Sequence, residues 1–213
     1  MKRSARRRAQ RGFTLIEVMV SLGIMMIGAM AVIGLQAQTI RANGYARQLT
    51  TATQIGQIWI ERLKQDACLW TQRAALTPVP PETVLAATAL GPTTYLSDIL
   101  AQRGRWVSPP ADAILLSRGF DFQGDDAPTA AGTPTPFYCS AYRLNWVFFG
   151  EAIRADVRVW WPRAGSAANP LADFPGCGSA GGSLDSLDPG GAAVNNYHAV
   201  YVSTVMRVTP LTR

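Results

Sequence analysis

A single acidic residue interrupts the most apolar stretch of the chain. The stretch from Phe13 to Leu35, FTLIEVMVSLGIMMIGAMAVIGL, carries one charge, Glu17. At about 1.5 Å of rise per residue, a helix of this length crosses a hydrocarbon core of about 30 Å. An ionised carboxylate near the centre of such a core costs as much as ~3 kcal/mol, and less near an interface. Glu17 therefore needs either a partner or a position from which it reaches the headgroups or takes up a proton.

Basic residues precede the apolar stretch, and no acidic residue stands among them: Lys2, Arg3, Arg6, Arg7, Arg8 and Arg11. They account for the whole formal net charge of +6, so the chain from Phe13 onward is neutral. Because Lys and Arg beside an apolar span hold that end inside, we expect a cytoplasmic N-terminus. No aromatic residues interleave with this basic run, which argues against nucleic-acid binding.

The three cysteines, Cys68, Cys139 and Cys177, match no tetrahedral zinc pattern, which requires closely spaced pairs. In an oxidising compartment they would form one disulfide and leave one thiol unpaired. We favour the pair Cys139 and Cys177, because both fall in the distal region of the chain. Cys68 lies on a predicted helix, where it would be a small buried apolar residue.

Other candidate chemistry is weaker. The segment GCGSAGGSLDSLDPGG lacks the lysine and the following helix of a phosphate-binding loop. His198, the one histidine, has no cysteine or serine motif beside it. Acidic residues in turn-rich segments could offer oxygen ligands to calcium: Asp121, Asp125 and Asp126, or Asp185 and Asp188. Their spacing fits no EF-hand loop, and solvated turn acids are the favoured interpretation. We expect no metal, no cofactor and no catalytic residues, and hence no enzyme.

The string RGFTLIEVMVSL, which begins at Arg11, resembles the class III signal sequence of type IV prepilins and type II secretion pseudopilins. The resemblance implies that a membrane peptidase cuts after Gly12 and methylates the new amine of Phe13. It also implies that Glu17 pairs with the N-terminal amine of a neighbouring subunit during assembly. Glycine offers an unobstructed backbone to a protease, and a cut at this point leaves the apolar anchor intact.

Within that family the chain is most similar to PilV-type minor pilins. This implies a minor pilin that primes assembly of a type IV pilus or sits at its tip; the alternative is a minor pseudopilin of a type II secretion system. The implied partners are prepilin peptidase/N-methyltransferase, other minor and major pilins, the inner-membrane assembly platform and, as a further candidate, a tip adhesin.

The resemblance also implies a location. The anchor would cross the bacterial inner membrane once, with a cytoplasmic N-terminus and a periplasmic head, before the subunit enters a pilus on the cell surface. A hypothesis from another class stays open, namely a bitopic enzyme or receptor with an uncleaved anchor.

Beyond Leu35 the apolar residues keep helical spacing but occupy one side. They form a stripe of Tyr45, Leu49, Ala52, Gly56, Trp59, Leu63, Ala67 and Trp70. The pattern predicts one nearly continuous helix from Phe13 to about Cys68 or Thr71, spanning at first and amphipathic later. The prolines of TPVPP, from Thr77 to Pro81, stop it.

Two segments alternate apolar and polar residues with the period of a strand, Tyr138 to Phe149 and Arg154 to Trp161. The short link GEAI predicts a hairpin between them, and a third strand is expected from about Ala199 to Val208. Short helices are expected over 82–90 and 95–102.

An antiparallel sheet laid on the amphipathic helix makes an α+β fold, the type IV pilin architecture. The expected segments are a cleaved cytoplasmic leader (1–12), a transmembrane helix (13–35), an amphipathic helix (36–73), a variable region between helix and sheet (74–137), and the antiparallel sheet with a long Gly-rich loop (138–213).

Overall fold

The computed structural model describes residues 13–76, 85, 95–109, 119–127, 136–164, 177, 184–191 and 193–207. The expected leader and the TPVPP stop lie outside the described residues. Of the helix expected over 82–90, only Leu85 is described, and it is helical and buried. A boundary between two compact units of the chain falls between Arg47 and Gln48.

The long helix α1 spans Leu15–Leu76. The predicted end at Cys68 or Thr71 was wrong by at least five residues, because the segment QRAAL that follows Thr71 consists of good helix formers. Of the helix expected over 95–102, only the last part is helical, as α3 (Asp98–Gln102).

The predicted apolar stripe is buried from Ala52 onward. Its buried members are Ala52, Trp59, Leu63, Ala67 and Trp70, and Ile55 joins them. Tyr45 and Leu49 were also assigned to the stripe, and this was wrong because both are exposed. The sheet covers the helix only from about Gln48, whose side-chain oxygen accepts a hydrogen bond from Trp161 at 3.3 Å.

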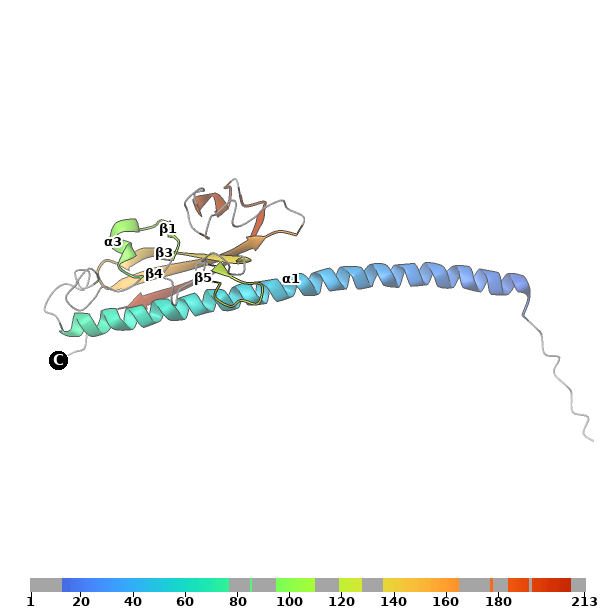
Figure 1. Ribbon diagram of the computed structural model, residues 1–213, viewed down its shortest axis with the longest axis horizontal. Coiled ribbons are helices and arrows are strands. Elements are labelled where there is room, and N and C mark those ends of the chain that lie inside the picture. The colour runs from blue at the N-terminus through green and yellow to red at the C-terminus, as the bar shows by residue number, and fades with distance from the viewer. Residues whose placement is uncertain are drawn as a thin grey trace, which may run out of the picture. The chain divides into compact units, whose positions relative to one another are not determined.

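Within the described residues, the sheet has five strands in the order β1-β3-β4-β5, with β2 also paired to β3. Its members are β1 (Trp106–Val107), β2 (Gly119–Phe120), β3 (Tyr138–Phe148), β4 (Ala152–Pro162) and β5 (Tyr197–Arg207), and all pairings are antiparallel. Figure 1 shows β3, β4 and β5 side by side. The three long strands confirm the sequence prediction, and the sheet with its helix confirms the α+β class.

The predicted β3–β4 link was too long. The turn consists of Phe149, Gly150 and Glu151, while Ala152 and Ile153 of the GEAI segment already belong to β4. Gly150 has a positive φ of 75°, which a residue without a Cβ adopts at little cost. The Glu151 N–H donates to the Phe148 carbonyl at 3.1 Å and closes the turn.

One face of the sheet packs on α1 and forms the main core. Alternate residues of the central strands point to it: Tyr138, Tyr142, Leu144, Ile153, Ala155, Val157, Val159 and Trp161. At the closest approach, a Cβ added to Gly56 would lie 2.8 Å from a methyl of Val202 on β5. A glycine in the helix therefore allows the sheet to approach closely.

The opposite face of the sheet is also partly covered, which the alternating pattern did not predict. The 3-10 helix η2 (Leu184–Leu187) and Cys177 form a second apolar cluster with β1, β3 and β4. Trp160 and Arg158, which point to this face, are both fully buried. In the alternation predicted from Arg154 to Trp161, Arg158 is one of the polar residues opposite the apolar ones; it is buried all the same, because a loop distant in sequence covers it.

Candidate assembly segment

The N-terminal apolar stretch begins with an ordered first turn. The Thr14 carbonyl accepts hydrogen bonds from the N–H groups of Glu17, at 3.1 Å, and Val18, at 3.3 Å. Helix α1 therefore starts at Leu15, two residues after the predicted start. Phe13 stands just before the helix with 82% of its surface exposed.

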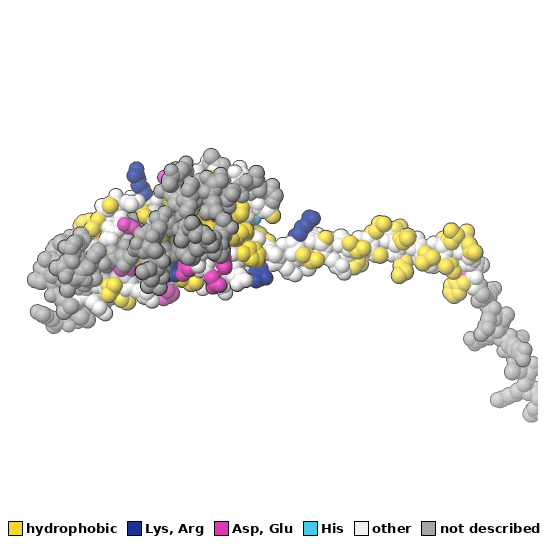
Figure 2. All heavy atoms as spheres, viewed as in Figure 1, with side chains coloured by type: hydrophobic (Ala, Val, Ile, Leu, Met, Phe, Trp, Pro, Cys, Tyr) yellow, Lys and Arg dark blue, Asp and Glu magenta, His cyan; other side chains and the backbone are white. Residues whose placement is uncertain are grey.

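This part of α1 carries apolar residues at successive positions all round the helix, and Figure 2 shows exposed apolar side chains along one face of it. Every described side chain from Phe13 to Arg47 is exposed, and the exposed fraction of Met30 reaches 74%. A helix that is apolar all round is expected inside a membrane or among other helices. The described residues contain one helix long and apolar enough to cross a membrane.

Glu17 lies in the first turn of this helix, where the helix dipole favours a negative charge. Its main-chain carbonyl accepts a hydrogen bond from the Ser21 hydroxyl at 2.7 Å. Within the described part of the chain, the Glu17 carboxylate itself has no hydrogen-bond or ion-pair partner. The carboxylate is therefore exposed beside the apolar side chains.

The glycines of the stretch leave the helix intact. Helix α1 continues through Gly23, Gly28 and Gly34 without a break. A Cβ placed on any of the three would meet nothing within 4 Å. Their surroundings are open, so small residues here are compatible with close approach of a neighbouring helix.

Residues 7–33 match a family model described as the prokaryotic N-terminal methylation motif. The match supports a type IV prepilin-like protein. Its range includes Gly12, Phe13 and Glu17, and it implies processing by a prepilin peptidase and assembly with other pilins. With the exposed apolar helix, it also indicates membrane anchoring. No curated protein and no solved structure matches the chain significantly.

The site residues named from the sequence fall in two separate places. Phe13 and Glu17 stand at the start of the described chain, four positions apart, while Gly12 and the basic leader lie outside the described residues. Cys139 and Cys177 belong to the head, the unit from Gln48 onward. Phe13 and Glu17 are close because they are neighbours in sequence, whereas Cys139 and Cys177 are brought together by the fold.

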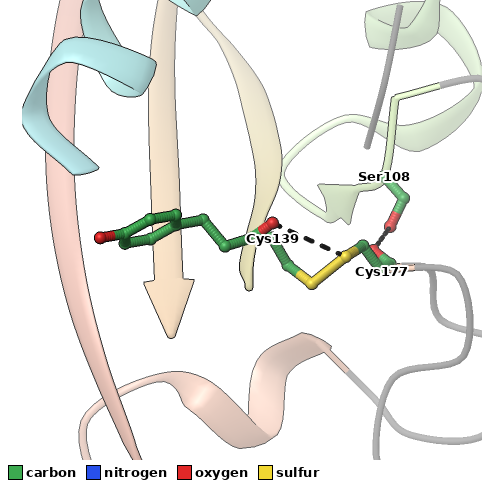
Figure 3. The surroundings of a disulfide bond; sticks show 4 residues. Ser108, Cys139 and Cys177 are labelled. Carbon is green, nitrogen blue, oxygen red and sulfur yellow. Dashed lines mark hydrogen bonds between the residues drawn. A yellow bond between two sulfur atoms is a disulfide. The ribbon is translucent and has the colours of Figure 1, made fainter. Parts of the chain in front are cut away.

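Figure 3 shows the disulfide that joins Cys139 on β3 to Cys177, the pair favoured from the sequence. Both cysteines are fully buried, and their Cα atoms lie 5.2 Å apart. The Ser108 hydroxyl donates to the Cys177 carbonyl at 3.1 Å, which holds the backbone beside the bridge. Cys68 is a free thiol on the exposed side of α1, so its assignment as a buried residue was wrong. It lies one position after the buried Ala67, about 100° further around the helix.

Arg158 forms a buried polar site that sequence reasoning missed. Its guanidinium donates to the Asp188 carboxylate at 2.7 Å and to the Leu184 carbonyl at 2.6 Å, and it lies 4.1 Å from the centre of the Trp106 ring. Burial lowers the pKa of this guanidinium, while Tyr201 and Asp188 act in the opposite direction. The contacts attach the η2 loop to the sheet. No local pattern identifies this role, because its partners come from distant parts of the chain.

A buried acid, Asp66, serves the head in a similar way. One of its oxygens accepts hydrogen bonds from the N–H groups of Tyr95, at 2.8 Å, and Leu96, at 2.9 Å. It thereby ties the segment before α3 to α1. The sequence offered no signal for this residue beyond an acid on the buried side of an amphipathic helix.

Three of the acids considered as calcium ligands, Asp121, Asp126 and Asp188, make side-chain contacts within the protein. The Asp121 carboxylate accepts hydrogen bonds from the N–H groups of Gln123, Gly124 and Asp125 at 2.8 to 3.0 Å. Asp126 pairs with Arg62 of α1 at 2.8 Å. These interactions organise the turn after β2 and attach it to the helix.

Proposed function

We propose that this chain is a minor pilin, which a prepilin peptidase cuts after Gly12 and methylates on Phe13, and which primes assembly of a type IV pilus or sits at its tip. The observation that carries the proposal is the methylation motif over residues 7–33, together with the exposure of every apolar side chain of α1 up to Arg47. The chain acts as a structural subunit and not as an enzyme.

The chemistry of assembly follows from two charges on one helix end. Cleavage frees a positive amine on Phe13, and Glu17 lies four residues further along the chain, in the first turn of α1. Charges in hydrocarbon are costly unless paired. An incoming subunit whose Glu17 meets the amine of its neighbour neutralises both charges, so assembly relieves a cost that the isolated anchor bears.

Intact mass of the protein purified from its native membrane tests the processing step. We expect the loss of residues 1–12 and the addition of one methyl group. An unprocessed N-terminus would support a bitopic protein with an uncleaved anchor and would refute the proposal. Deletion of the gene should then abolish pili; loss of protein secretion with normal pili would assign the chain to a type II secretion system.

Glu17→Gln tests the charge pairing, with Glu17→Asp as the matched control that keeps a carboxylate. We expect normal cleavage of both variants, and at least a tenfold loss of incorporation for the glutamine variant alone. Incorporation is measured by the amount of the chain in sheared pili relative to membranes. Equal incorporation of Glu17→Gln and the parent chain would overturn the pairing role.

A further inference from the structure

Strand β5 stands at one edge of the sheet. Its residues from Tyr197 to Arg207 pair with β4 in an uninterrupted register, without a bulge. In the described part of the chain, no strand pairs with the other side of β5. Figure 1 shows β5 beside β4 and along the helix.

The hydrogen-bond pattern shows which groups of β5 face outward. The Arg163 N–H donates to the Asn196 carbonyl at 3.0 Å just before the strand, which sets the phase of the antiparallel ladder. In that phase the odd-numbered residues from Ala199 to Val205 direct their N–H and C=O groups away from β4. The Tyr197 carbonyl agrees with this assignment, because it accepts from the Arg163 side chain at 3.0 Å and not from the ladder.

This edge lacks the features that protect edge strands from pairing. The segment AVYVSTVM, from Ala199 to Met206, contains no charged residue and no proline. Native edges are ordinarily blocked by lysine, proline or a bulge. Apolar side chains are exposed along it as well, with 49% of Tyr201 and 59% of Val205 exposed. Water can satisfy these outward-facing donors and acceptors one by one, but their regular spacing also makes them a template for another extended chain.

A pocket of about 200 Å³ lies next to this edge. It is lined by Tyr197, Ala199 and Tyr201 of β5 and by Leu187, Pro189 and Val194, and Arg163 adds a charged side chain to this mostly apolar lining. Alternate side chains of a strand added to β5 would lie on this same side of the sheet. In strand addition, main-chain hydrogen bonds provide affinity and such pockets provide specificity. The pocket therefore suits one apolar side chain of the added strand.

The loop residues that line the pocket, Leu187 and Pro189, flank Asp188, which is held in place by the buried Arg158. Asp188, which follows η2, binds Arg158 at 2.7 Å, and the Tyr201 hydroxyl donates to the Leu187 carbonyl at 3.4 Å. The loop that shapes the pocket is therefore attached to both β4 and β5. A preformed pocket lowers the ordering cost of binding.

A second copy of this chain is a poor occupant. The start of β5 lies near Gln48 of α1, through Trp161, and its end lies near Trp70, through Trp146. From Gln48 onward, α1 and β5 therefore run in the same direction. Two copies paired edge to edge in antiparallel register would have their helices reversed. Subunits of an open filament meet through heterologous contacts, whereas a pair of identical edges is an isologous contact that closes on itself.

We propose that β5 is a docking edge for an extended, uncharged segment of a different partner subunit, which adds a strand beside Ala199–Val205 and places an apolar side chain in the pocket. The proposal rests on the proposed function in one respect: the partner is expected to be another subunit of the same pilus. It assigns partner recognition to the head, separate from the pairing of anchors.

The test uses the full chain in its native host, with the photo-crosslinking residue p-benzoylphenylalanine at Val205. Ser203→Pro removes one outward N–H without touching the β4 ladder, and Ser203→Thr is its matched control. We expect one adduct, mapped by mass spectrometry to a neutral segment of another subunit. Its yield should fall at least tenfold with Ser203→Pro and stay unchanged with Ser203→Thr.

Ala199→Trp fills the pocket while keeping the edge, and we expect it to lower the adduct yield as well. Retention of the Cys139–Cys177 disulfide shows that each variant folds, and Ser203→Lys replaces the proline variant if that one does not. An absent adduct, an adduct insensitive to the edge variants, or an adduct to a second copy would overturn the proposal. Removal of residues 1–12 is measured in the same samples, so an unprocessed parent chain would instead count against the proposed function.

Discussion

Helix α1 contains two stretches of similar helical character whose apolar side chains have different surroundings. From Phe13 to Arg47 every described side chain is exposed, and apolar residues occur on all sides. From Ala52 to Trp70 the apolar residues form one stripe, and that stripe is buried against the sheet. The same secondary structure therefore has two partners: the chain's own sheet completes the second stretch, and lipid or other helices must complete the first.

The largest expected difference between the stretches concerns large apolar side chains. Trp59 is buried against Tyr95 and Tyr142, with ring centres 5.5 and 6.2 Å away, whereas Ile27 is exposed. Trp59→Ala should lower the free energy of unfolding of the head by about 3–5 kcal/mol. Ile27→Ala should leave it unchanged. Urea unfolding of the full chain in detergent, followed by far-UV circular dichroism, measures both; equal losses would contradict the comparison.

Two glycines of α1 sharpen the comparison with a smaller effect. A Cβ on Gly56 would lie 2.8 Å from a Val202 methyl, whereas one on Gly44 would meet nothing within 4 Å. Gly56→Leu should overpack the interface and cost about 1–3 kcal/mol. Gly44→Leu should instead favour the helix by about 1 kcal/mol. Thermal unfolding distinguishes the two, and a stabilising Gly56→Leu would show that the sheet does not approach the helix closely at this point.

The smallest expected effect concerns the Tyr142 phenol, which lies on β3 beside Trp59 of the buried stretch. Burial and the hydrogen bond that Tyr142 donates to Asp98 raise the pKa of the Tyr142 phenol. In the unfolded chain a tyrosine ionises near pH 10. The stabilisation is therefore fully present below about pH 10 and is lost as the pH rises above it.

Tyr142→Phe should cost about 1 kcal/mol at neutral pH and reduce the alkaline loss. Urea unfolding at several pH values between about 8 and 11 measures this. An equally steep alkaline decline in the variant would assign the loss to other groups.

Several features of the fold followed from periodicity alone. The long helix, its buried stripe from Ala52, and the strands β3, β4 and β5 each carry the pattern of apolar residues that their environment requires. The methylation motif matched over residues 7–33 was equally accessible, because its residues are neighbours in sequence. Errors occurred where the local pattern does not show how far a feature extends. The end of α1 was placed too early, and the covered part of the stripe was extended to the exposed Tyr45 and Leu49.

By itself, the sequence determined the parts of this protein whose physics is local: a basic leader, an apolar anchor with one acid near its start, and the alternation that makes strands. Only the tertiary structure decided that Arg158 is buried under Asp188, that Cys68 is exposed, and that β5 is an edge next to a pocket. The physical reason is that the charge and hydropathy of a segment, and their periodicity, are set by residues that are adjacent in sequence. Burial of a side chain and pairing of a strand depend on segments that fold over it from elsewhere in the chain.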